Sequence, residues 1–86
     1  DASTSTAKPR ASILIAINDL GEIWINKRKI DEGQVRANIE RLHAENPQGT
    51  VVVQADEEAR TKTLVAVMDA AREAGVTDVS LATEKK

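Results

Sequence analysis

Val51-Val52-Val53-Gln54-Ala55-Asp56 is an apolar, largely β-branched run, and Val79-Ser80-Leu81-Ala82 alternates apolar and small polar residues. Both patterns are typical of β-strands, the first of a strand covered on both faces. Between them, residues 60–74 place apolar side chains at helical spacing, with an inward stripe of Leu64, Val67, Met68 and Ala71. A strand, a helix and a second strand of this length predict a right-handed crossover between parallel strands.

The residues before this unit predict a β-hairpin. Ile13-Leu14-Ile15-Ala16-Ile17 is β-branched and apolar, and residues 22–26 alternate polar and apolar. Asn18-Asp19-Leu20-Gly21 joins the two strands with residue types that favour turns. The basic run Lys27-Arg28-Lys29 that follows is interpreted as a solvated loop.

A first helix is predicted between the hairpin and the central strand. Asp31 and Gln34 resemble a capping pair at its start, and Asn46-Pro47 ends it. Its apolar stripe consists of Val35, Ile39 and Leu42. Arg36 with Glu40, Arg41 with Glu45 and, on the second helix, Asp69 with Arg72 are spaced as ion pairs. Gly75 is expected to end the second helix in a left-handed conformation, with Val76 packing back on Ala71.

The element order is therefore β-β-α-β-α-β. We expect an α/β (mixed α+β) fold with two helices on one face of a mixed four- to five-stranded sheet, and Thr50-Val51-Val52-Val53 as its central strand. Residues 1–11 are expected to form a flexible tail, residues 12–83 the domain and residues 84–86 a frayed end.

Composition narrows the function classes. The 86 residues carry a formal net charge of −2 and a single aromatic residue, which argues against nucleic-acid binding, since that needs a basic face and stacking platforms. There is no cysteine, so a disulfide or a thiolate metal site is excluded. No apolar stretch approaches the roughly 20 residues that span a membrane.

Catalytic chemistry finds little support. His43 is the single histidine, and its position favours a surface or rim residue over a ligand. The acidic cluster Asp56-Glu57-Glu58 lies between a strand and a helix, where carboxylates complement the helix dipole and cap free N–H groups. We therefore expect no catalytic residue, no cofactor and no metal. Trp24 either covers one end of the core or serves as an exposed anchor for a partner.

Several motifs, in order, resemble the periplasmic domain of the ExbD/TolR family. They are Val51-Val52-Val53-Gln54-Ala55-Asp56, then residues 63–69 (Thr-Leu-Val-Ala-Val-Met-Asp), then Ala74-Gly75-Val76 and Val79-Ser80-Leu81. Gln54 stands where the family usually has a basic residue. The tail Ala2-Ser3-Thr4-Ser5-Thr6 is similar to the linker that follows the membrane helix in the ExbD branch.

The resemblance implies a non-enzymatic domain in the periplasm, anchored in the bacterial inner membrane by a helix upstream. It implies a homodimer with an ExbB-like channel subunit and a TonB-like energy transducer as partners. It also implies use of proton-motive force for outer-membrane transport such as siderophore and iron uptake. The family's proton-carrying aspartate lies in the membrane helix, so none of Asp19, Asp31, Asp56, Asp69 and Asp78 is expected to take that role.

The expected binding surface is the last strand. Val79, Ser80, Leu81, Ala82 and Thr83 are predicted to form a sheet edge that accepts another strand, with Trp24 as a further partner contact. The tail residues 2–6 are expected to act as a switch, because the tail could compete for this edge. Two alternatives remain: a TolR-like domain that binds peptidoglycan or TolA for envelope integrity, and a small-molecule regulatory domain with Asp56–Glu58 at its site.

Overall fold

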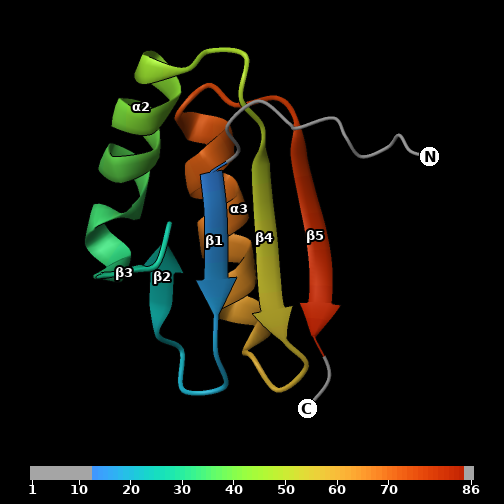
Figure 1. The fold of residues 1–86 in the computed structure, drawn as a ribbon. Helices are drawn as coiled ribbons and strands as arrows, with labels where there is room; N and C mark the ends of the chain where they lie inside the picture. The colour runs from blue at the N-terminus through green and yellow to red at the C-terminus, as the bar shows by residue number, and fades with distance from the viewer. Residues whose placement is uncertain (1–12, 85–86) are drawn as a thin grey trace, which may run out of the picture.

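The computed structural model describes residues 13–84, which form one five-stranded sheet covered by helices on one face (Figure 1). The elements in chain order are β1 (Ile13–Ile17), β2 (Ile23–Ile25), β3 (Arg28–Ile30), a 3₁₀ turn η1 (Glu32–Gln34), α2 (Val35–Glu45), β4 (Val51–Asp56), α3 (Thr61–Glu73) and β5 (Val79–Glu84). The predicted order of elements is confirmed, with one short strand added.

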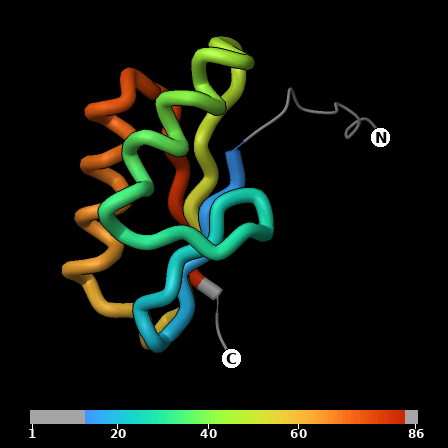
Figure 2. Tube along the Cα trace, turned by 90° about the vertical axis from the view of Figure 1, so that its left-hand side faces the viewer, coloured from blue at the N-terminus to red at the C-terminus, as the bar shows by residue number. Residues whose placement is uncertain are grey.

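The sheet has the strand order β3-β2-β1-β4-β5. β1, β2 and β3 pair antiparallel as a meander, whereas β1, β4 and β5 are parallel. The predicted crossover from β4 through α3 to β5 is therefore present, and a second crossover, from β3 through α2 to β4, shares its geometry. Because each crossover carries its helix to the same side, the opposite face of the sheet is left without a helix (Figure 2).

The core lies between the sheet and the two helices. Alternate residues of β1 and β4 point into it, and Ile15 and Val53 are both fully buried. α2 contributes Val35 and Ile39, and α3 contributes Val67 and Ala71. With no Phe or Tyr in the chain, this core consists of branched aliphatic side chains and alanine. Both predicted inward stripes face the core, but Leu42 and Leu64 are only partly buried against it, and Met68 is partly buried beside it.

The C-terminus of α3 ends in the predicted Schellman motif. Gly75 has a φ of 96°, the Gly75 N–H donates to the Arg72 carbonyl at 3.0 Å, and the Val76 N–H donates to the Ala71 carbonyl at 3.1 Å. Val76 is 2% exposed and packs in the core. The motif ends α3 and redirects the chain toward β5, which begins three residues later at Val79.

Several sequence-based expectations were wrong, and the first concerns the segment after β2. The basic run Lys27-Arg28-Lys29 is not a loop: Asn26 and Lys27 form a tight turn with φ of 52° and 71°, and Arg28–Ile30 continues as β3. Two consecutive positive φ values match the twist of a hairpin, and Ile30 packs against the core. This hairpin was hard to predict from the sequence, because its turn residues are Asn26-Lys27 and not the Asn-Gly pair that is typical of such turns.

The central strand is β1, not residues 50–53, and no strand is covered by helices on both faces. Val52 and Gln54 are half-buried on the open face because the second crossover also places its helix on the covered side.

Neither helix start is capped as expected. Asp31 makes no side-chain cap, and the first turn is held instead by the Gln34 N–H on the Asp31 carbonyl at 2.8 Å. Asp56 accepts the Glu58 N–H at 2.7 Å within a turn that precedes α3, so the acidic cluster stabilises the loop and does not cap the helix.

Candidate protein-binding edge

β5 is an edge strand, as predicted, and half of its backbone groups point away from the sheet. The Val51 N–H donates to the Asp78 carbonyl at 3.0 Å, and the register pairs Val51 with Val79. In a parallel ladder, every second residue of a strand bonds to the same neighbouring strand. The backbone N–H and C=O groups of the even-numbered residues of β5 therefore point toward β4. The N–H and C=O groups of Val79, Leu81 and Thr83 are therefore directed outward, available to another strand.

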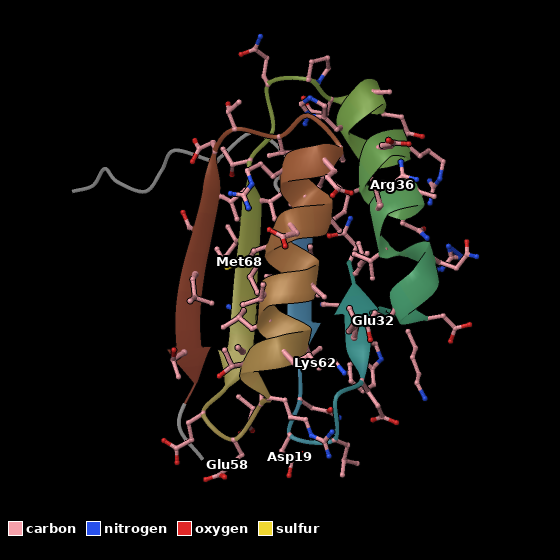
Figure 3. The ribbon with its side chains drawn as sticks, turned by 180° about the vertical axis from the view of Figure 1, so that it is seen from behind. Asp19, Glu32, Arg36, Glu58, Lys62 and Met68 are labelled. Carbon is pink, nitrogen blue, oxygen red and sulfur yellow. The ribbon has the colours of Figure 1, made fainter. Side chains whose placement is uncertain are left out.

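An apolar groove runs beside this edge, between β5 and α3. Its volume is about 610 Å³, and Val65, Met68 and Val79 supply much of its apolar lining. Met68 lies on the side of α3 that faces β5 (Figure 3). Val65 is 49% exposed and Leu81, on the adjoining strand, is 46% exposed. Large aliphatic side chains are thus left in contact with water along the line of the free edge.

The side chains of β5 divide between the two faces of the sheet. Val79 and Leu81 pair with the buried residues Val51 and Val53 and so point to the helix side, whereas Ser80 and Ala82 point to the open face. The side chains on the groove side belong to the same residues whose backbone groups are free. A strand added to β5 would place every second side chain on the helix side of the sheet, which is the side that carries the groove at Val79.

The rim of the groove is polar but close to neutral. Arg72 and Asp69 form the predicted ion pair there, with 73% and 51% of their side chains exposed. An exposed pair of this kind contributes little to stability. The groove therefore combines an apolar lining with a rim that is nearly neutral, a surface better matched to aliphatic side chains than to charged ones.

The other predicted site residues are not all brought together. Trp24 lies on β2, separated from β5 by β1 and β4, and is half-buried on the open face beside Ala16 and Lys29. It cannot share one strand-sized site with the β5 edge. The switch tail, residues 2–6, lies outside the described residues.

The sequence analysis did not identify α3 as part of this site. Met68 was predicted to face the core and Asp69 and Arg72 to form an ion pair, but all three residues also line the groove. The available signal was Val65, which together with Met68 and Arg72 follows an i, i+3, i+7 spacing beside the main stripe. When the apolar residues of a helix extend beyond the face that packs in the core, they indicate a second contact surface on that helix.

His43, the single histidine, is half-buried beside the loop that follows α3. The His43 ring lies against Gly75, and its Nδ1 atom is buried without a hydrogen-bond partner. Within residues 13–84 there is no group of three or more potential metal-binding side chains. Over the same residues, no helix combines the length and the hydropathy needed to cross a membrane.

The fold and its open edge define a class: a small mixed α/β domain with two parallel crossovers and an unpaired strand beside an apolar groove. Comparison with known proteins narrows the class to one family. The family model described as biopolymer transport protein ExbD/TolR matches residues 1–86, and the chain belongs to this family of transport-associated, non-enzymatic proteins.

Two relatives illustrate the match. The chain is 42% identical over 84 residues to the biopolymer transport protein ExbD2 of Vibrio cholerae serotype O1. It is 29% identical over 82 residues to a biopolymer transport protein of the ExbD type from Synechocystis sp.. These alignments cover 98% and 95% of this chain but 63% and 30% of the relatives, so the chain spans less than two thirds of either relative.

Proposed function

We propose that this chain is the periplasmic coupling domain of a proton-motive-force-driven motor in the bacterial inner membrane, and that its β5 edge binds an extended segment of a TonB-like transducer. The observation that carries the proposal is that the outward-facing backbone groups of Val79, Leu81 and Thr83 form an edge which meets the groove beside α3 at Val79. Family membership supports the transport role and, through it, an ExbB-like channel subunit and a homodimer as further partners.

Strand addition explains how such a site combines affinity with selectivity. Backbone hydrogen bonds along β5 bind any extended segment, while the side chains that reach the groove discriminate between segments. Val65 and Met68 favour a partner with aliphatic residues at every second position. The partner's other side chains would lie on the open face near Ser80 and Ala82, where the surface is less apolar.

The test is a titration of the isotope-labelled domain with a peptide from the periplasmic linker of a TonB-like protein, followed by two-dimensional NMR. Strand addition predicts that the amides of Val79, Leu81 and Thr83 become protected from hydrogen exchange. Those of Ser80 and Ala82, already bonded to β4, change less. Protection without this alternation, or no shift at all, would contradict the proposal, and purified sacculi would then test peptidoglycan binding.

A matched pair of variants separates the groove from the general surface. Val65 and Leu20 are both exposed aliphatic residues, at 49% and 77%, but Leu20 lies in the β1–β2 turn away from the groove. V65D should weaken peptide binding at least tenfold because it places a charge in the apolar contact, whereas L20D should leave binding within twofold of wild type. Equal effects of the two substitutions would refute a role for the groove.

A further inference from the structure

A second concave site lies at the opposite edge of the sheet, between β3 and α2. This basic hollow has a volume of about 290 Å³ and is lined by Ile25, Asn26, Arg28, Asn38, Arg41 and Leu42. Its volume is just below the range of about 300–1,000 Å³ for ligand pockets, so it suits a small ligand. It shares no lining residue with the groove beside β5.

The hollow combines an apolar floor with two guanidinium groups. Ile25 is 3% exposed and Leu42 packs against the core, so both are held in place by the fold. Arg28 lies on the helix side of β3 because it pairs with the buried Ile25, and Arg41 approaches from α2. Two like charges that line one hollow repel each other, and an anion between them removes that repulsion.

The two arginines differ in how they are held. Arg41 donates to the Asn38 side-chain oxygen at 2.9 Å and lies 3.9 Å from the Glu45 carboxylate, a loose and exposed contact. Asn38 is itself fixed by a hydrogen bond to the Gln34 carbonyl at 2.8 Å. Among the described residues, Arg28 has no ion-pair partner. Arg41 is thus oriented by its neighbours, while Arg28 is free to close on a ligand.

The strand that carries Arg28 is positioned by the turn before it. Asn26 and Lys27 both have positive φ, an uncommon state for residues other than glycine. The Asn26 side chain accepts the Leu14 N–H at 3.0 Å, and the Asn26 N–H donates to the Leu14 carbonyl at 2.8 Å. These two bonds tie the turn to β1 and fix the start of β3, and with it the base of the Arg28 side chain.

We propose that the basic hollow binds a carboxylate attached to a short aliphatic side chain, as found at the C-terminus of a peptide or in an N-acylated amino acid. The planar guanidinium groups of Arg28 and Arg41 match a carboxylate, which accepts paired hydrogen bonds from such forks. The aliphatic group would rest on Ile25 and Leu42. This site does not depend on strand addition at β5.

The test is an NMR titration of the labelled domain with N-acetyl-leucine, using N-acetyl-leucinamide as the uncharged ligand of the same shape. We expect saturable shifts at Ile25–Arg28 and Asn38–Leu42, and at least tenfold weaker binding of the amide, because charge-assisted hydrogen bonds are lost. Equal binding of the amide, or of inorganic phosphate, would overturn the proposal, as would the absence of a saturable shift at tens of millimolar ligand.

Variants distinguish specific binding in the basic hollow from nonspecific attraction of the anion to positive charge on the surface. R28A should weaken N-acetyl-leucine binding at least tenfold, and R28K should recover only part of it because lysine lacks the planar fork. Arg36 also lies on α2, but it contacts Glu40 and Glu73 and does not line the hollow, so R36A is the matched control and should change affinity less than twofold. Equal losses in R28A and R36A would refute the assignment.

Two further measurements sharpen the result. E45Q removes the carboxylate that competes for Arg41 and should tighten binding two- to threefold. A peptide ending in leucine and its C-terminally amidated form then distinguish the sources. A peptide acid that binds more tightly than N-acetyl-leucine indicates a chain terminus, and equal affinity indicates a small acylated amino acid. V65D should leave both affinities unchanged, which keeps this site separate from the proposed β5 edge.

Discussion

Replacement of Gly75 by alanine tests how the helix α3 passes into the edge strand. Gly75 has a φ of 96°, where an L-residue is strained by about 1–2 kcal/mol. A Cβ atom there would meet the nearest His43 carbon at 3.9 Å, an ordinary contact, so no steric clash adds to this cost. The lower entropy of the unfolded chain returns about 0.4–1 kcal/mol. We therefore expect G75A to lower the free energy of unfolding by about 1 kcal/mol.

Gly33 provides the matched control for this substitution. It lies in η1, its φ is not positive, and a Cβ atom there would meet nothing within 4 Å. G33A should therefore stabilise the domain by about 0.4–1 kcal/mol, opposite in sign to G75A. Urea unfolding followed by the fluorescence of Trp24, the one tryptophan, measures both variants.

Thermal unfolding gives an independent reading, because about 1 kcal/mol corresponds to a shift in Tm of about 4–8 °C in a domain of this size. If G75A is as stable as wild type, the left-handed conformation at position 75 does not require glycine, and the reasoning is refuted. A loss above about 3 kcal/mol would instead mean that the space beside His43 is too small for a methyl group.

Three further predictions concern the core, the hairpin and pH. Ile39 is fully buried, so I39A should cost about 2–5 kcal/mol in urea unfolding, and a loss below 1 kcal/mol would contradict its place in the core. K27G should stabilise by about 0.5–1 kcal/mol and raise Tm, because glycine relieves the φ of 71°; a lowered Tm would refute this. Hydrogen bonds from Asn18 and Lys29 lower the pKa of Glu22. Because the folded pKa is the lower one, this stabilisation is present above the ordinary glutamate pKa of about 4.3 and is lost as pH falls through the lowered value. Unfolding free energies measured from pH 6 downward should therefore fall more steeply in wild type than in E22Q, and parallel profiles would contradict the assignment.

Much of the fold was predictable because local pattern and tertiary environment agree. The β-branched runs at 13–17 and 51–56 became β1 and β4, and the stripes that include Ile39 and Val67 became the buried faces of α2 and α3. The Gly75 turn followed from residue type alone, since a left-handed helix end needs a residue without Cβ. The resemblance to the ExbD/TolR family was based on motifs between Val51 and Leu81, and the family match confirms it.

The candidate sites were less predictable, because each depends on elements distant in the sequence. The edge position of β5 was predicted, but the groove beside it exists only where α3 leaves Val65 and Met68 uncovered next to that strand. The basic hollow needs β3, which was interpreted as a loop, to bring Arg28 beside Arg41. Neither spacing nor residue type indicates that two positions 13 residues apart share one cavity.

Apart from β3, the sequence by itself determined which segments are strands and helices, which of their faces are apolar, and where α3 ends, because these depend on interactions within a few residues. The tertiary structure decided that β1 and not β4 is central, that one face of the sheet stays open, and which edge carries a groove. Strand order and helix placement depend on how the two crossovers pack against the same sheet, and no local pattern in the chain encodes that choice.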